Sequence, residues 1–126
     1  MSYLFDAYAW IEYLQGSSKG EKVNDFLNSG EEIFVLPITI AEVVSKTKRM
    51  ESNAELAYKV IISKSKILDL TPKIAKEAGL LQAQMRKKYP QFGIVDAILI
   101  ETAKSTGTKI ITGDHHFKDF KEAIII

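Results

Sequence analysis

The chain contains no cysteine, which excludes a disulfide framework, a thiolate metal site and a cysteine nucleophile. Any metal ion bound by this chain must therefore be held by oxygen or imidazole ligands. A long apolar run is also missing, because the longest one, 33–44, is interrupted by Pro37, Thr39 and Glu42 and is too short and too polar to cross a bilayer. The N-terminal segment 1–6 has neither a basic region nor a long apolar region, so we infer no secretion signal and expect a cytoplasmic domain.

A strong overall charge is missing as well, since 17 Lys and Arg stand against 16 Asp and Glu and the formal net charge is +1. This balance hides a segregation of charge along the chain. Residues 46–88 hold 11 basic and 4 acidic side chains, a net charge of +7, whereas the other residues together carry −6. The basic segment is either a set of solvated helix faces or a flank that attracts a polyanion beside an acidic centre.

Apolar runs of strand length alternate with segments of helical period, a pattern typical of βαβ units around a parallel sheet. We therefore expect a single α/β domain over residues 1–126, with a central parallel sheet of about five strands flanked by α-helices. The expected strands are 2–6, 33–36, 66–70, 109–112 and 123–126, and the expected helices are 9–15, 18–28, 39–50, 52–63, 72–89 and 94–105.

Four acidic residues occupy matching places in this pattern. Asp6 and Asp114 each follow an expected strand, Glu42 lies in the first turn after another, and Asp96 lies on a helix that is otherwise nearly all apolar. The carboxyl ends of parallel strands form the binding crevice of an open α/β sheet, so acids far apart in sequence can meet there. The pattern therefore predicts one crevice lined by four carboxylates.

Each acid also has a structural explanation. Glu42 could complete a capping box with Thr39, Asp114 could be a turn or N-cap residue, and Asp6 could terminate its strand. Asp96 is the hardest to explain in this way, because an ionised carboxylate without a partner in apolar surroundings costs several kcal/mol.

Few basic side chains lie near these acids in the sequence. No Lys or Arg lies within three residues of Asp6, Asp96 or Asp114, although Lys46 is one helical turn from Glu42. Clustered carboxylates raise one another's pKa and call for a bound cation, and an all-oxygen donor set suits Mg²⁺ or Mn²⁺. Such an ion supports phosphodiester hydrolysis, so the sequence predicts a carboxylate metal centre beside a basic flank for a nucleic-acid backbone.

The residues resemble the PIN-domain ribonucleases, in particular the single-domain VapC-type toxins of toxin–antitoxin pairs. The resemblance covers essentially the whole chain and rests on an ordered set of segments: Phe5-Asp6, LPITIAE at 36–42, ILDLT at 67–71, VDAILIETA at 95–103 and IITGDHHF at 110–117. No single segment is specific, but their order and spacing are.

The resemblance implies a function and a set of site residues. Asp6, Glu42, Asp96 and Asp114 would bind Mg²⁺ or Mn²⁺, as one ion or two, and support the hydrolysis of single-stranded or exposed RNA, with Thr112 orienting the site through its hydroxyl. The resemblance also implies a small antitoxin partner that covers the crevice, and a homodimer.

The chain departs from the family pattern at two positions. Ala7 replaces the Ser or Thr that many members have after the first acid, and His116 replaces a further Asp. His116 either touches the phosphate or the metal, or is a turn or packing histidine. The candidate RNA contacts are the basic residues Lys46, Lys48, Arg49, Arg86, Lys87 and Lys88.

Two other functions remain open. A receiver-like signalling domain would use Asp69 as its phosphoacceptor, but it usually needs an acidic pair after the first strand, where this chain has Asp6-Ala7. A catalytically inactive module that binds RNA or a protein partner is the third interpretation, and the complete set of four acids argues against it.

Overall fold

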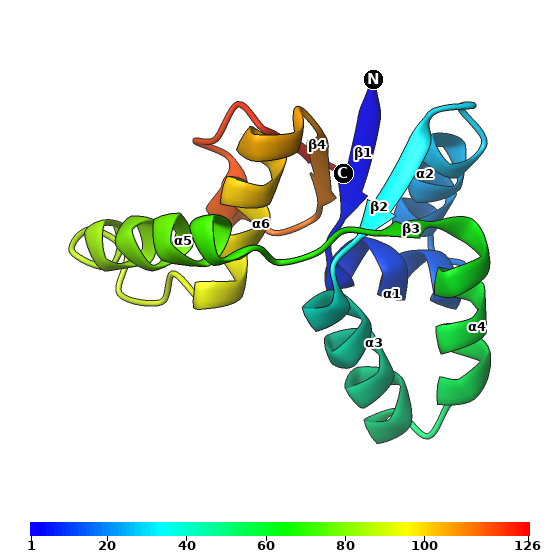
Figure 1. The fold of residues 1–126 in the computed structure, drawn as a ribbon. Helices are drawn as coiled ribbons and strands as arrows, with labels where there is room; N and C mark the ends of the chain where they lie inside the picture. The colour runs from blue at the N-terminus through cyan, green and yellow to red at the C-terminus, as the bar shows by residue number, and fades with distance from the viewer.

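A computed structural model describes residues 1–126 and shows a five-stranded parallel sheet covered by helices on both faces (Figure 1). The strands are β1 (Ser2–Phe5), β2 (Glu32–Val35), β3 (Lys66–Ile67), β4 (Lys109–Thr112) and β5 (Ala123–Ile125), and they lie in the order β3-β2-β1-β4-β5. Every neighbouring pair is parallel. The predicted α/β class and the five-stranded sheet are confirmed.

Six α-helices and one short 3-10 helix connect the strands. They are α1 (Ala7–Gln15), α2 (Ser18–Leu27), α3 (Pro37–Arg49), α4 (Ala54–Lys64), α5 (Pro72–Met85), α6 (Ile94–Thr106) and η1 (His115–Phe117). None of the helices combines the length and the apolar character that crossing a bilayer requires.

The strands β1, β2 and β4 each end in mainly apolar, buried residues because both faces of the centre of the sheet are covered. Phe5 and Ile111 point into a core with α1 to α4, whereas Leu4 and Ile110 point into a second core with α5 and α6. Adjacent residues of a strand face opposite sides of a sheet, so each run of consecutive apolar residues supplies both cores.

The strand order places a topological switch point between β1 and β4. From β1 the chain builds outward through β2 and β3, and it then returns to add β4 and β5 on the other side. Phe5 pairs with Ile111, so the residues that follow these two strands are neighbours in space. Ligands of open α/β sheets bind at this point, beyond the carboxyl ends of the strands.

The helix α3 begins at Pro37, two residues before the expected start. Proline suits the first turn because its φ is already helical and its missing N–H would have no partner there. Leu36 is therefore the N-cap, and Thr39 is buried inside the helix. The capping box between Thr39 and Glu42 does not form, so that structural explanation of Glu42 is wrong.

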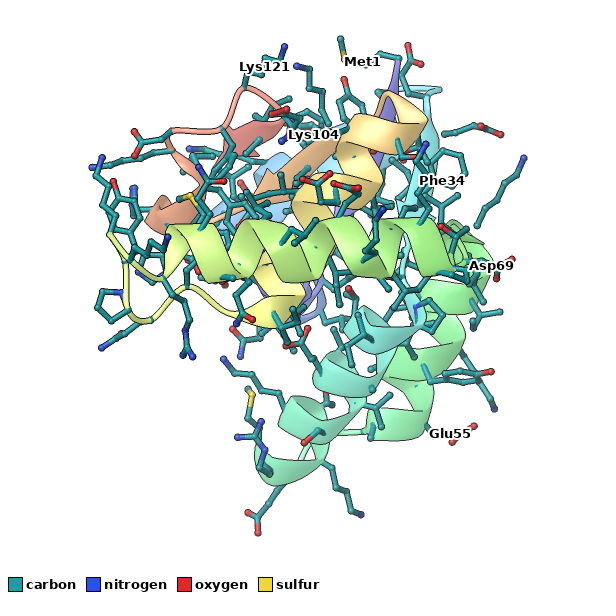
Figure 2. All side chains as sticks on the ribbon, turned by 60° about the vertical axis from the view of Figure 1, so that its left-hand side comes forward. Met1, Phe34, Glu55, Asp69, Lys104 and Lys121 are labelled. Carbon is teal, nitrogen blue, oxygen red and sulfur yellow. The ribbon has the colours of Figure 1, made fainter.

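Other boundaries shift at the edges of the elements. The expected strand 66–70 is reduced to Lys66–Ile67, with one further sheet hydrogen bond from the Leu68 N–H to the Val35 carbonyl. Asp69 lies beyond this strand in exposed chain at the edge of the molecule (Figure 2). The helix α5 ends at Met85, and turns replace the expected helix over 86–89.

Close packing of α1 against α2 depends on a glycine. A Cβ built on Gly20 would overlap the backbone carbonyl of Glu12, lying 2.7 Å from its carbon atom. Backbone in a helix cannot yield as a flexible side chain can, so the two helices reach this separation only because residue 20 has no side chain.

We expect Gly20→Ala to destabilise the fold by about 1–3 kcal/mol, because the added methyl group forces α1 and α2 apart. The matched control is Gly79→Ala on α5, where a Cβ meets no atom within 4 Å. That change should stabilise the fold by about 0.5–1 kcal/mol, through the better helix propensity of alanine. Urea unfolding of both variants measures the difference, and equal effects would contradict the packing account.

Candidate active site

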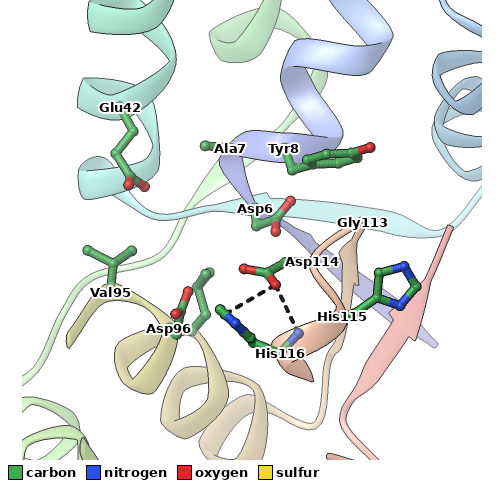
Figure 3. A pocket seen from close by; sticks show the side chains of 11 residues that line it. Asp6, Ala7, Tyr8, Glu42, Val95, Asp96, Gly113, Asp114, His115 and His116 are labelled. Atoms are coloured by element: carbon green, nitrogen blue, oxygen red, sulfur yellow. Dashed lines mark hydrogen bonds and ion pairs between the residues drawn. The ribbon is translucent and has the colours of Figure 1, made fainter. Parts of the chain in front are cut away.

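The four acids predicted from the sequence line one cleft at the carboxyl end of the sheet. The cleft has a volume of about 480 Å³, and its walls include Asp6, Glu42, Asp96 and Asp114 (Figure 3). Asp6 follows β1, Asp114 follows β4 by two residues, Asp96 lies in the first turn of α6, and Glu42 lies in the second turn of α3. The fold therefore brings together side chains that are up to 108 positions apart in the sequence.

Asp6 and Asp114 are fixed by the helices that they cap. The Ala9 N–H donates to Oδ1 of Asp6 at 2.8 Å at the start of α1, and the His116 N–H donates to Oδ1 of Asp114 at 2.9 Å at the start of η1. The capping role considered for Asp114 is thus real, and it coexists with a place in the cleft. For Asp6, helix capping takes the place of simple strand termination.

Thr112 is the last residue of β4 and is buried next to the two strand-end acids. Its hydroxyl oxygen accepts a hydrogen bond from the Asp114 N–H at 3.0 Å, and the hydroxyl group donates toward Asp6. Its orienting role is a prediction that this geometry allows, because the same hydroxyl contacts both strand-end acids.

Asp96 and Glu42 differ in how firmly they are held. Oδ2 of Asp96 accepts a hydrogen bond from the Gly93 N–H at 3.2 Å, and the residue is half-buried. Glu42 faces the cleft from α3 and forms neither a hydrogen bond nor an ion pair with another side chain. Its carboxylate is therefore free to bind a ligand or a proton.

No lysine or arginine is paired with any of the four acids. The basic side chain that contacts an acid in the cleft is that of His116, whose Nδ1 lies 3.4 Å from Oδ1 of Asp114. Burial raises the pKa of Asp6 to about 7, and the charges of Asp114 and Asp96 add to this rise. Hydrogen bonds from Thr112 and Ala9 act in the opposite direction without cancelling it.

Burial and neighbouring negative charges also raise the pKa of Asp96 and of Glu42. Burial and the charge of Asp114 raise the pKa of Asp96, against the Gly93 N–H and His116, which lower it. Partial desolvation and the charge of Asp96 raise the pKa of Glu42. Each of these shifts marks a carboxylate whose negative charge is poorly compensated by the protein itself.

The donor set fits a hard divalent cation. Ligand atoms of Asp96, Asp114 and His116 all lie within 4.8 Å of one another, and Asp6 and Glu42 add carboxylates to the same cleft. Carboxylate oxygens suit Mg²⁺ or Mn²⁺, whereas an imidazole nitrogen is the preferred ligand of later transition metals, so the acids are the expected ligands and His116 lies beside them. His116 lies in a turn, as one alternative held, but its side chain is half-exposed and faces Asp114, so it does not serve as a packing residue.

The six basic residues predicted as RNA contacts lie outside the cleft wall. Lys46, Lys48 and Arg49 are in the last turn of α3, and Arg86, Lys87 and Lys88 follow the end of α5. All six are exposed. Asp69 is also exposed and lies outside the cleft, so it is not placed among the acids where a receiver-like domain would need its phosphoacceptor.

Several lining residues were not singled out as site residues in the sequence. Tyr8 and His115 line the rim, Gly113 lies between them, and Val95 and Leu99 form an apolar part of the wall. Tyr8 follows Asp6 by two positions, but in sequence it resembles any aromatic residue of an amphipathic helix. His115 and Gly113 belong to the segment that carries Asp114, and this proximity was the one available signal.

Solved structures with the same fold cover nearly the whole chain. The VapBC2 complex of Rickettsia felis, bound to a DNA fragment from its promoter, has a TM-score of 0.75 at 20% identity and covers 100% of this chain and 98% of its own. A toxin–antitoxin complex from Klebsiella pneumoniae has a TM-score of 0.74 at 21% identity, covering 97% of this chain and 95% of its own. Mycobacterium tuberculosis VapC20, a sarcin-ricin loop cleaving toxin, has a TM-score of 0.73 at 12% identity and covers 94% of this chain and 95% of its own.

At these identities the structural likeness shows the fold, and the sequence itself shows the family. No curated protein matches the chain. The family model of the PIN domain matches residues 3–123, a range that contains all four acids of the cleft. The chain therefore belongs to the PIN domain family.

Proposed function

We propose that this chain is a Mg²⁺- or Mn²⁺-dependent endoribonuclease and the toxin of a toxin–antitoxin pair. The observation that carries the proposal is the meeting of four carboxylates in one cleft with no lysine or arginine paired to them. Support for RNA as the substrate comes from VapC20, a relative in fold that cleaves the sarcin-ricin loop. Support for an antitoxin comes from the Rickettsia felis and Klebsiella pneumoniae structures, which are toxin–antitoxin complexes.

The residues of the cleft would have different roles in hydrolysis. Asp96 and Asp114 would hold the ion, with His116 beside them and Asp6 close by and oriented by Thr112. When bound, Mg²⁺ or Mn²⁺ supplies an activated water and neutralises charge on the scissile phosphate. Glu42 has a raised pKa and no hydrogen-bond partner, so its carboxylate can accept a proton from the attacking water.

The toxin assignment also predicts a protein partner and a homodimer. A small antitoxin that covers the cleft would exclude RNA, and a short neighbouring reading frame for a small DNA-binding protein would identify it. An inactive RNA-binding module is the remaining alternative, and it would bind RNA without giving a Mg²⁺-dependent product.

Neutralising Asp96 should abolish cleavage. In Asp96→Asn the amide oxygen can still accept the Gly93 N–H, so the fold is retained while one negative charge is lost. We expect the rate of RNA cleavage to fall at least about a hundredfold, the size of effect typical for an essential acid or base. Asp69→Asn, an exposed acid outside the cleft, is the matched control and should cleave at the wild-type rate. Wild-type cleavage by a carefully purified Asp96→Asn protein would refute the proposed mechanism.

Divalent ions should stabilise the folded protein. An ion that binds the native cleft and not the unfolded chain raises the melting temperature by mass action. Millimolar Mg²⁺ or Mn²⁺ should therefore raise Tm in the wild type, and Asp96→Asn should lose most of that increment. Sodium chloride at equal ionic strength controls for screening. An equal rise in both proteins would show that the ions act elsewhere.

Without divalent ions, the charge of Asp6 should make stability fall as pH rises. The folded-state pKa of about 7 lies above the ordinary value of 3.8, so the folded state holds its proton more tightly than the unfolded state between these values. The free energy of unfolding should therefore drop from about pH 4 to pH 7, by up to about 4 kcal/mol for this group.

Asp6→Asn tests this directly, because asparagine caps a helix as well as aspartate and carries no charge. In chelator at pH 7.5, Asp6→Asn should be more stable than the wild type toward urea, and at pH 4 the difference should vanish. A variant less stable than the wild type at both pH values would contradict the assigned cost of the Asp6 charge.

A further inference from the structure

An aromatic side chain lies at the rim of the acidic cleft. Tyr8, in the first turn of α1, is 36% exposed and lines the cleft beside Asp6 (Figure 3). Large aromatic side chains are usually buried more fully, so an exposed ring at the edge of a polar cleft is available to a ligand.

The ring of Tyr8 packs closely against Gly113. A Cβ built on Gly113 would overlap the ring of Tyr8, with Cδ1 and Cζ both only 2.5 Å away. The ring therefore occupies space that the side chain of any other residue at position 113 would need. Because Gly113 directly precedes Asp114, this contact ties Tyr8 to the chain segment that carries one of the proposed metal ligands.

A lysine lies at the outer end of the same ring. Nζ of Lys19 donates to the Tyr8 hydroxyl at 3.2 Å and lies 5.4 Å from the ring centroid, which places the ammonium group at the hydroxyl end of the ring. Lys19 belongs to α2, and the neighbouring Gly20 allows α2 to pack closely on α1. No acidic side chain forms an ion pair with Lys19, so its charge is available to an anion.

We propose that Tyr8 and Lys19 form a subsite for one unpaired nucleotide of the RNA, next to the nucleotide whose phosphate is cleaved. Tyr8 stacks on the base and Lys19 binds a phosphate. The proposal rests on the ribonuclease function proposed above, and it names a substrate contact of the same site. The acidic cleft, the Tyr8 ring and the Lys19 ammonium group lie in this order. This order matches the alternation of phosphate and base along single-stranded RNA.

This subsite suits RNA with splayed bases in particular. Stacking on an aromatic face tolerates any base, and it requires that the base is not already stacked inside a helix. The subsite therefore selects for single-stranded or looped RNA without selecting a sequence. It also places an ammonium group in contact with a residue of the cleft wall, because Lys19 binds the Tyr8 hydroxyl.

The test uses RNA binding by an inactive protein, so that binding and cleavage are read separately. The probe is a single-stranded RNA of mixed sequence, together with copies that carry an abasic site at each position in turn, bound to the Asp96→Asn protein. Adding Tyr8→Leu should weaken binding of the intact RNA about tenfold, which is within the range measured for loss of one stacked base. One abasic position should weaken binding to the protein with Tyr8 and have no further effect with Tyr8→Leu.

Matched substitutions of a tyrosine and a lysine outside the subsite control for general effects of such changes on RNA binding. Tyr58→Leu removes an exposed tyrosine from α4, and Lys22→Ala removes an exposed lysine from α2, and both should leave the affinity unchanged. Lys19→Ala should weaken binding and reduce the salt slope by about one counterion. Tyr8→Phe keeps the stacking face and loses the hydroxyl, so it should retain most of the affinity and the response to the abasic position. If Tyr8→Leu fails to fold, the abasic series on the parent protein and Lys19→Ala carry the test.

The outcomes separate this subsite from the proposed function. Cleavage of the same RNA by the wild type in Mg²⁺ tests the nuclease, whatever Tyr8 does. The subsite is overturned if Tyr8→Leu binds as tightly as its parent, if every abasic position acts equally in the presence and absence of Tyr8, or if the Asp96→Asn protein binds none of the probes. If Tyr8→Leu binds RNA as tightly as its parent but is no longer inhibited by the antitoxin, the ring contacts the protein partner, and the subsite is overturned too.

Discussion

The gathering of partly desolvated carboxylates in one cleft, with no lysine or arginine paired to them, is the constraint on which the rest of the site depends. Asp6, Asp96 and Asp114 are each held by a backbone N–H at the start of a helix, from Ala9, Gly93 and His116 respectively. These neutral donors orient the acids and lower the pKa values of Asp6 and Asp96, but burial, together with the charges of the neighbouring carboxylates, still leaves both of these pKa values raised. The protein thus positions its acids without supplying the cation that would stabilise them.

The parallel sheet makes this arrangement possible. Because β1 and β4 are adjacent and point the same way, Asp6 and Asp114 meet at their carboxyl ends although they are 108 positions apart in the sequence. The helices α3 and α6 begin at the same edge, and they add Glu42 and Asp96 from either side (Figure 3). Two fully buried strand faces provide a rigid base, so the acids cannot move apart to relieve their repulsion.

The fold class and the four acids could be predicted because each depends on local pattern: apolar strands that alternate with helices, and a carboxylate after a strand or within an apolar helix. The extent of β3 could not, because an exposed edge strand pairs on one side only. The capping alternative for Glu42 failed because Pro37 starts α3 early. The contacts of Tyr8 with Gly113 and Lys19 were invisible in the sequence, since they arise from close backbone approach between separate elements.

The central claim is that the acids of the cleft share a divalent cation. Crystals of the wild type grown with Mn²⁺, measured at a wavelength where manganese scatters anomalously, test it most directly. We expect an anomalous peak in the cleft, within coordination distance of Asp96 and Asp114, and no such peak in Asp96→Asn crystals grown in the same solution. A wild-type cleft without a peak at saturating Mn²⁺, or an equal peak in the variant, would contradict the account.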